Sequence, residues 1–375
     1  MKELSELLDR VYETDNYKEV VCGKGKKAYL FFSSNGLFFP DEYTVAEKVL
    51  IQQDRYEWEN IVSDKTILKD CGKIIFLRDV YKSWYVQGIN SKIDSADKLG
   101  GFLKKKCDGY KVVTVGSSAG GYAAVLFGLM LKAEMVFCFS GQFDLYNHKN
   151  VLTTYPRLQR FKNEEERNKY YNLIPLISSN REVPIFYFCP IKSEDDAKQY
   201  ELVVNKKMLY IFRMDSEIHG NVVKPQNYKH LFGGGGRTYL KALSFCLKKS
   251  MISMERLYFL TSGRKYHEKQ YQFPYEKVPK GTKIAIWGAG AVGRSYYKQL
   301  KKKRYCKIVG WVDKNYQKEE NEGKVVAPDE LKNMDMEYVV IAVKNEKIAG
   351  EIRRTIEEMD LKQVQIIVAG VIESN

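Results

Sequence analysis

Residues 111–128, with the sequence KVVTVGSSAGGYAAVLFG, decide the fold of the larger part of the chain. An apolar run, KVVTV, ends in the turn Gly116-Ser117-Ser118-Ala119-Gly120, and small and apolar residues follow directly. This order predicts a strand buried on both faces, a tight turn and a helix. Ser118 would stand at the N-terminus of the helix, where free N–H groups and the helix dipole favour negative charge. An ordinary glycine- and serine-rich turn is the alternative interpretation.

Five further runs have the character of buried strands. Most are apolar throughout rather than alternating, as expected for a mainly parallel sheet that is covered on both faces. Helical patterns separate them, and this alternation predicts a doubly wound α/β fold. The runs are AYLFFSS at 28–34, KIIFLRD at 73–79, MVFCFSG at 135–141, PIFYFCP at 184–190 and MLYIFRM at 208–214.

The length of 375 residues favours two domains. We expect a catalytic α/β domain at 1–250. Within it, the polar and aromatic segment 142–183 is expected to be a helical insertion that forms a cap over the sheet. Residues 251–280 are expected to be a linker, because they are aromatic and basic. A second, small α/β domain is expected at 281–375.

The G-x-S-x-G spacing at a strand-to-helix turn is typical of a nucleophilic serine, and such a serine needs a base. The chain has four histidines. His219 directly follows the last predicted strand of the first domain, where the base of such a fold is found. His148, His230 and His267 lie in the insertion, near a later helix and in the expected linker. His219 is therefore the candidate base.

The acid that orients the base should follow the preceding strand, so that the chain order is serine, acid, histidine. The segment IKSEDDAK after that strand offers Glu194, Asp195 and Asp196. Any of these carboxylates could hold the imidazole tautomer and stabilise the imidazolium. We favour Asp196 slightly over Asp195, and Asp144, which follows an earlier strand, is the alternative.

The negative charge that develops during acyl transfer requires N–H donors. One donor should be the backbone N–H of Ala119, the residue after the nucleophile. The other should come from the loop after an early strand, where Ser34 and Asn35 lie between two apolar runs. Asn35-Gly36 could equally form a simple hairpin turn.

Taken together, the turn VGSSAGGYAA, the SSNG loop, the acidic run and the late His-Gly resemble α/β-hydrolase-fold proteins of bacterial surface-polysaccharide loci. Some of these proteins are O-acetyltransferases that modify capsule sugars. The resemblance covers roughly residues 28–250 and implies that Ser118, His219 and Asp195 or Asp196 form a catalytic triad. It also implies transfer of an acyl group, with an acyl-CoA as a candidate donor, to a glycan or glycan precursor through an acyl-serine.

Two other functions remain open at this point. A carboxylesterase or deacylase would use the same triad, because it also passes through an acyl-serine. A nucleotide-sensing scaffold with a degenerate hydrolase domain would need no triad at all. The lack of a signal peptide and the attached second domain favour the transferase.

The second domain opens with KIAIWGAGAVGRSYYKQLKK at 283–302. Gly288, Gly290 and Gly293 have the spacing G-x-G-x-x-G after a strand, and Asp313 ends the next strand, as in the Rossmann fingerprint for dinucleotides. The domain is the size of one mononucleotide-binding half. It resembles small Rossmann-like modules of bacterial sugar-modifying enzymes, which implies a nucleotide, NAD or nucleotide-sugar ligand. Docking or dimerisation is the alternative.

The formal net charge is +14, and such a positive field favours acidic partners. We expect an acidic glycan or glycan precursor, and no nucleic acid, because no nucleic-acid-binding motif is present. Association with the inner membrane surface and a homo-oligomer are both compatible with the sequence. A lysine-rich surface without a special partner is the alternative.

Composition also bounds the location and the cofactors. The first 15 residues read as a short amphipathic helix without the apolar run of a signal peptide. No stretch has the 18 or so apolar residues of a transmembrane helix. The seven cysteines are scattered and form no C-x-x-C pair, so we expect reduced thiols, a cytoplasmic protein and no metal site.

Overall fold

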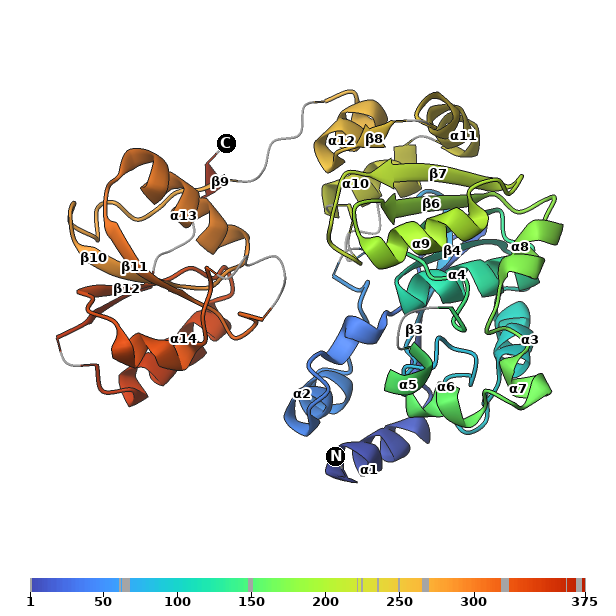
Figure 1. Ribbon diagram of the computed structural model, residues 1–375, viewed down its shortest axis with the longest axis horizontal. Coiled ribbons are helices and arrows are strands. Elements are labelled where there is room, and N and C mark those ends of the chain that lie inside the picture. The colour runs from blue at the N-terminus through green and yellow to red at the C-terminus, as the bar shows by residue number, and fades with distance from the viewer. Residues whose placement is uncertain are drawn as a thin grey trace. The chain divides into compact units, whose positions relative to one another are not determined.

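In the computed structural model the chain forms two compact units, residues 1–266 and 267–375, which are described separately below (Figure 1). The structure describes all residues except 1, 61, 63–67, 148–150, 221, 224, 235, 249, 265–269, 318–323, 362, 369–372 and 375.

The first unit is built on an eight-stranded sheet with the strand order β1-β3-β2-β4-β5-β6-β7-β8. Strand β1 runs antiparallel to β3, and all other described neighbours pair in parallel. The predicted mainly parallel α/β sheet is therefore confirmed. The strands are β1 (Tyr17–Val21), β2 (Lys27–Phe32), β3 (Cys71–Leu77), β4 (Lys111–Ser117), β5 (Met135–Phe139), β6 (Ile185–Pro190), β7 (Leu209–Met214) and β8 (Met251–Ile252).

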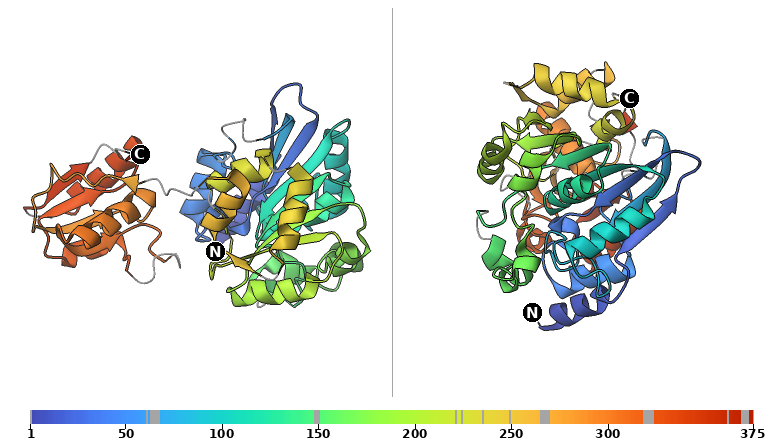
Figure 2. Two further views of the ribbon diagram at one scale, coloured as in Figure 1. Left: turned by 90° about the horizontal axis from the view of Figure 1, so that it is seen from above. Right: turned by 90° about the vertical axis from the view of Figure 1, so that its right-hand side faces the viewer.

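Helices cover both faces of this sheet (Figure 2). Successive side chains of a strand point to opposite faces, so the apolar runs supply two cores. Phe32 and Val112 pack on one face, and Phe31 and Val113 pack on the other. The first face carries α3 (Ala96–Lys106), α4 (Ala119–Met130), α8 (Ile174–Ser179) and α9 (Glu194–Val203); the second carries α10 (Pro225–Lys229), α11 (Gly236–Cys246) and α12 (Met254–Ser262).

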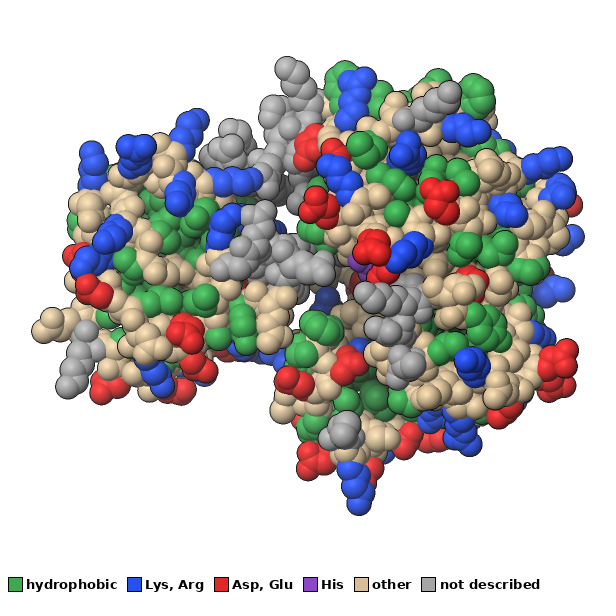
Figure 3. All heavy atoms as spheres, in the orientation of Figure 1, with side chains coloured by type: hydrophobic (Ala, Val, Ile, Leu, Met, Phe, Trp, Pro, Cys, Tyr) green, Lys and Arg blue, Asp and Glu red, His purple; other side chains and the backbone are tan. Residues whose placement is uncertain are grey.

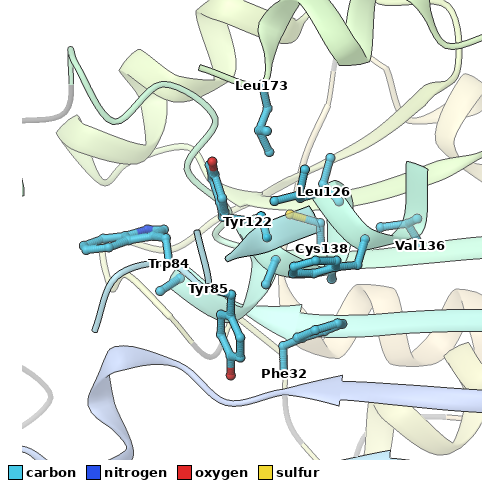
Figure 4. Close-up of a cluster of buried hydrophobic side chains, with 14 of the residues drawn as sticks. Phe32, Trp84, Tyr85, Tyr122, Leu126, Val136, Cys138 and Leu173 are labelled. Carbon is cyan, nitrogen blue, oxygen red and sulfur yellow. The ribbon is translucent and has the colours of Figure 1, made fainter. Parts of the chain in front are cut away.

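Figure 4 shows part of the first of these cores. Phe32 of β2 stacks on Phe127 of α4 with a centroid distance of 5.5 Å, and Tyr85 meets Phe32 edge-on at 5.3 Å. Tyr85 comes from the loop after β3, so this loop is anchored in the core beneath the helix that Ser118 precedes.

The segment 142–183, expected as a helical insertion, contains four short helices among its described residues. They are α5 (Val151–Thr154), α6 (Pro156–Arg160), α7 (Glu165–Asn168) and α8. Tyr171 and Leu158 of this segment are buried in the first core, and an isolated bridge joins Asp144 to Asn172. At the N-terminus, the predicted amphipathic helix is α1 (Lys2–Tyr12), which packs against α2 (Tyr43–Glu47).

The prediction that residues 251–280 form a linker is wrong for the first part of this segment. Residues 251–252 form β8, which pairs with β7, and Leu257 of α12 is fully buried in the second core. Ser253 caps α12 by accepting a hydrogen bond from the Arg256 N–H. Aromatic and basic residues separate the apolar residues of this segment, so the sequence pattern does not predict that the segment packs on the sheet. Phe273 and Val278, at the other end, belong to the core of the second unit.

The second unit has a four-stranded parallel sheet with the order β11-β10-β12-β13. Helix α13 contributes to the core on one face and α14 to the core on the other. The glycine-rich turn joins β10 to α13. The elements are β10 (Lys283–Trp287), α13 (Ala291–Lys303), β11 (Lys307–Val312), β12 (Tyr338–Ile341), α14 (Glu346–Glu358) and β13 (Gln365–Val368), with the small pair β9 (Gln270–Tyr271) and β14 (Glu373–Ser374) beside them.

Candidate active site

Ser118 stands at the turn between β4 and α4, as predicted. Its backbone has φ 54° and ψ −122°, a conformation that residues other than glycine rarely adopt. Its N–H donates to the Phe139 carbonyl oxygen at 2.9 Å, and its own carbonyl accepts the Tyr122 N–H at 3.0 Å. The strained residue is therefore held between a neighbouring strand and the first turn of α4. Strain of this kind concentrates at functional sites.

The glycines around Ser118 are required by close backbone approach. A Cβ at Gly116 would collide with the carbonyl oxygen of Gly120, and a Cβ at Gly120 would collide with that of Phe32. The turn thus packs against itself and against the end of β2. The sequence pattern has a steric cause here, whereas an ordinary glycine-rich turn would leave these positions open.

His219 and Asp196 lie in a hydrogen-bonded row with Ser118. The His219 Nε2 atom is 2.7 Å from Ser118 Oγ, and its Nδ1 atom is 2.8 Å from Asp196 Oδ2. Asp196 is 1% exposed and His219 is 37% exposed, measured on their side chains. The Ser193 hydroxyl also donates to Asp196 Oδ2, at 2.6 Å. The row therefore runs from a buried carboxylate to a serine that solvent can reach.

The topology explains how three distant residues meet. Ser118 follows β4, Asp196 lies in α9 directly after β6, and His219 follows β7. Parallel strands end at the same edge of the sheet, so the segments after β4, β6 and β7 all emerge there. The order serine, acid, histidine along the chain is the one expected from the sequence.

The other acids considered from the sequence do not share this geometry. Asp195 is the neighbour of Asp196 on α9 and is half-buried, and no hydrogen bond joins it to His219 in the described part of the chain. Asp144 accepts the N–H groups of Tyr146 and Asn147 and the Asn147 side-chain amide, so it closes a local turn.

The remaining histidines are not part of the row. His230 packs edge-on against Tyr258, and burial lowers the pKa of its imidazole. His148 and His267 lie outside the described residues.

The three expected oxyanion donors differ in their surroundings. Ala119 is the first residue of α4, a position at which a helix leaves its N–H groups without intrahelical acceptors. The Ser34 N–H already donates to Glu57 Oε2 at 2.5 Å, so the expectation that it would serve an oxyanion is not met. Burial raises the pKa of the Glu57 carboxyl, and the bond from Ser34 opposes this shift.

Asn35 begins a short 3₁₀ helix, η1 (Asn35–Phe38), rather than a hairpin turn. The Ser34 side chain caps this helix by accepting the Gly36 N–H at 3.2 Å. Asn35 lies near the Tyr155 hydroxyl, but its buried Nδ2 amide has no partner of hydrogen-bond geometry among the described residues. Asn35 lines the same cavity as Ser118, so its amide can donate a hydrogen bond to a molecule bound there.

A cavity of about 440 Å³ opens at Ser118 and His219. Its wall mixes amide, aromatic and charged side chains, and α5 of the helical segment adds Val151 and Thr154. The wall also includes Asn35, Asp41, Lys82, Trp84, Gln142 and Tyr155. Sequence reasoning missed all of these except Asn35, because they come from loops without a recognisable motif.

In the second unit, the three glycines of the turn after β10 have different environments. Gly288 has φ 119°, and a Cβ there would lie 2.7 Å from the Ala342 carbonyl oxygen. A Cβ at Gly293 would collide with the Gly288 carbonyl oxygen, whereas one at Gly290 would meet nothing within 4 Å. The first and third glycines are thus needed by the fold, and the second faces open space.

Asp313 holds this turn. Its Oδ2 atom accepts the Ala289 N–H and its Oδ1 atom accepts the Asn315 N–H, both at 2.7 Å. The Arg294 guanidinium donates to the Ala289 carbonyl at 2.8 Å. A cationic side chain and the N-terminus of α13 therefore stand beside Gly290, an arrangement suited to an anion.

The described residues contain neither a metal-binding cluster nor a membrane-spanning helix. No group of three or more His, Cys, Asp or Glu side chains in this part of the chain could hold a metal ion. No described helix has both the length and the apolar character needed to cross a bilayer.

Comparison with known proteins gives distant matches. The family described as "C2185-like, N-terminal" matches residues 280–367, which lie in the second unit. No curated protein matches the chain. A solved capsule O-acetyltransferase of Neisseria meningitidis serogroup A is 13% identical, with a TM-score of 0.38, over 62% of this chain and 92% of that one.

Two other solved structures are described as an α/β hydrolase and as an esterase. An α/β hydrolase, MGS-MChE2, from a sediment metagenome of the Mar Chica lagoon in Morocco is 12% identical with a TM-score of 0.29, covering 53% of this chain and 85% of that one. Esterase Est22 is 10% identical with a TM-score of 0.33, covering 65% and 84%.

Proposed function

We propose that the protein is a serine-dependent acyltransferase that acetylates a hydroxyl group of a bacterial surface-polysaccharide precursor in the cytoplasm. The observation that carries the proposal is the row Ser118–His219–Asp196 at the mouth of a cavity. Three side chains from three separate segments meet with bond distances of 2.7 and 2.8 Å. Structural packing alone does not require a strained serine next to a half-exposed imidazole.

In the first half-reaction, the Ser118 oxygen attacks the carbonyl carbon of an acyl donor, for which we propose an acyl-CoA. His219 Nε2 takes the serine proton and then gives it to the departing thiolate. Asp196 accepts the Nδ1–H of His219 and stabilises the imidazolium. The Ala119 N–H donates to the oxyanion of the tetrahedral intermediate. We propose the Asn35 amide as the second donor, in place of the Ser34 N–H.

In the second half-reaction, His219 removes the proton of an acceptor hydroxyl, which attacks the acyl-serine ester. The new ester leaves, and Ser118 regains its proton from the imidazolium. Water in place of the acceptor would make the protein an esterase or deacylase, with every protein group in the same role. The amide and aromatic groups of the cavity wall favour a polyhydroxylated acceptor, because they supply hydrogen-bond partners and a stacking surface together.

For the second unit we propose a Rossmann-like nucleotide-binding role. Open space at Gly290, the N-terminus of α13 and the Arg294 guanidinium would receive a phosphate of a nucleotide, an NAD or a nucleotide-sugar. Asp313 would accept a bond from a ribose hydroxyl in addition to its two backbone partners. A docking or dimerisation role would not require open space at Gly290.

We further propose that the acceptor is an acidic glycan or glycan precursor. On the face that Figure 3 shows, lysine and arginine side chains are spread over both units and are interspersed with acidic ones. A dispersed excess of charge raises the local concentration of an anion without defining a site. The acceptor KM should therefore rise with added salt.

Covalent labelling tests the nucleophile without knowledge of the substrate. A fluorophosphonate should attach to Ser118, and mass spectrometry of the digested protein should find the adduct there. Ser117→Ala is the matched control, because Ser117 is the adjacent residue and belongs to β4. Labelling that survives Ser118→Ala, or that is absent from the folded wild type, would contradict the proposal. Incubation with acetyl-CoA or 4-nitrophenyl acetate, with and without glycan acceptors, then separates transferase from esterase.

A further inference from the structure

The loop after β3 is an unusual piece of backbone. Three of its residues other than glycine have left-handed conformations: Lys82 at φ 53°, Trp84 at φ 54° and Tyr85 at φ 61°. Such conformations are unfavourable and persist only where the surroundings impose them, most often at binding or catalytic sites. The loop therefore places particular side chains at the expense of local strain.

Asp79 imposes these conformations from inside the loop. The carboxylate is buried and accepts the N–H groups of Tyr81, Ser83 and Tyr85, and also the Ser83 hydroxyl. Tyr85 then anchors the loop in the core, where its hydroxyl proton is shared between the Ser33 carbonyl oxygen at 2.8 Å and the Leu77 carbonyl oxygen at 3.1 Å. Four bonds to one carboxylate and a buried aromatic ring leave the loop little freedom.

The anchored loop directs Lys82 and Trp84 to the cavity at Ser118. Figure 4 shows the Trp84 and Tyr85 rings pointing apart from adjacent positions. Trp84 packs edge-on against Tyr155 at 4.8 Å and donates to Gln142 Oε1 at 2.8 Å. Lys82 and Trp84 both line the cavity. The strained backbone thus forms part of the wall of the proposed active site.

Lys82 has an unusual environment for a lysine. Its side chain is 8% exposed, and its ammonium group pairs with Asp41, whose side chain is 52% exposed. The same ammonium lies 4.0 Å from the centre of the Phe38 ring. An ammonium has three protons to donate, and Asp41 is its one hydrogen-bond acceptor in the described part of the chain. The remaining donors of this buried cation can form charge-assisted hydrogen bonds with an anion, and such bonds are stronger than neutral ones.

We propose that Lys82 binds a carboxylate or phosphate group of the molecule that Ser118 acylates or deacylates, and that Asp41 occupies this position when the cavity is empty. The inference rests on the proposed function and names the substrate class: an anion carried close to the ester. A substrate anion can displace Asp41 from Lys82, since Asp41 is exposed while Lys82 is buried. A purely structural ion pair is the competing explanation.

Two isosteric esters test the subsite. In 4-acetoxybenzoate and 4-acetoxybenzamide the same acetyl group is released, and the distal group is an anion in one and a neutral amide in the other. The ratio of kcat/KM for the two esters measures selectivity for the anion. A third ester, 4-acetoxyphenyl phosphate, compares phosphate with carboxylate.

The two partners of the pair should give effects of opposite sign. Lys82→Met should lower kcat/KM for 4-acetoxybenzoate about tenfold or more, through KM, and should change the benzamide ester less than twofold. Asp41→Asn should raise kcat/KM for the benzoate several-fold, because it removes the competing carboxylate. The matched control is Lys98→Met, which removes an exposed lysine paired with Asp94 and should change neither ester.

Equal losses for both esters in Lys82→Met and Asp41→Asn would overturn the subsite and leave a structural ion pair. If Lys82→Met does not fold, the sign of the Asp41→Asn effect decides alone. If the wild type cleaves neither ester and a fluorophosphonate does not label Ser118, the proposed function fails. In either case of no cleavage, calorimetry tests the subsite by itself. In that case 4-hydroxybenzoate should bind wild-type protein and Ser118→Ala more tightly than 4-hydroxybenzamide does; no preference would overturn the subsite.

Discussion

Replacing Asp196 by asparagine tests the proposed row of side chains more sharply than removing the serine. In the structure, one oxygen of Asp196, Oδ2, receives both His219 and the Ser193 hydroxyl. The other oxygen, Oδ1, is buried and has no partner among the described residues. An asparagine at this position keeps the shape of the side chain and must choose between two orientations.

The two orientations have different consequences. If the asparagine oxygen faces His219, its amide nitrogen takes the place of Oδ1, where a buried donor without an acceptor is unfavourable by about 1–3 kcal/mol. If the amide nitrogen faces His219, Ser193 can rotate to accept, but the imidazole must accept at Nδ1 and so carries its proton on Nε2. That tautomer cannot take a proton from Ser118. We therefore expect the second orientation and a loss of about 10⁴-fold in kcat, or about 5 kcal/mol in the barrier.

The assay is hydrolysis of 4-nitrophenyl acetate, with thermal unfolding as a check that the variant is folded. Asp195→Asn is the matched control, since it makes the same chemical change one position earlier on α9 and should retain at least half of wild-type kcat. A folded Asp196→Asn variant with more than a tenth of wild-type kcat, or an equal loss in Asp195→Asn, would refute the assignment of the acid.

Three other predictions follow from the packing around the two sites. Gly120→Ala should lower the free energy of unfolding by about 1–3 kcal/mol, because its Cβ would press on the Phe32 carbonyl; an unchanged urea midpoint would contradict this. Gly290→Val should leave the melting temperature within a few degrees and abolish nucleotide binding in calorimetry, whereas Gly293→Ala should destabilise the second unit; binding by a folded Gly290→Val variant would exclude the phosphate position. Glu57→Gln should keep an acceptor for the Ser34 N–H and most of the turnover, whereas Glu57→Ala should lose at least tenfold in kcat; equal activities would show that this bond does not position the loop.

Much of the candidate site could be predicted because residue chemistry and strand order restrict it strongly. Ser118 follows from a steric pattern, and His219 follows because it is the one histidine directly after a predicted strand end. The pair Asp195 and Asp196 could not be separated from sequence. Adjacent residues of a helix point about 100° apart, so the rotation of α9 about its axis decides which one faces His219.

The cavity wall could not be predicted, for a different reason. Lys82 and Trp84 face the site because the Asp79 carboxylate imposes positive φ angles on the loop. Positive φ angles at residues other than glycine cannot be predicted from the residue type. The role of Glu57 depends on a contact with Ser34 across 23 residues. The short strand β8 was missed because two residues carry no periodicity.

The end of β2 connects these separate features into one structural argument. The Phe32 carbonyl accepts the Trp58 indole N–H at 3.0 Å, and it is also the atom that a side chain at Gly120 would strike. One residue later, Ser33 Oγ accepts the Glu57 N–H, and the Ser34 N–H returns a bond to the Glu57 carboxylate. The turn that carries Ser118 and Ala119 therefore packs directly on the loop that carries Asn35. Glu57 and Trp58 fix the start of that loop through the hydrogen bonds just described. The Ala119 N–H and the Asn35 amide, which we propose as the oxyanion donors, would thus be held in place before a substrate arrives. Donors that need no reorganisation as charge develops stabilise an oxyanion effectively.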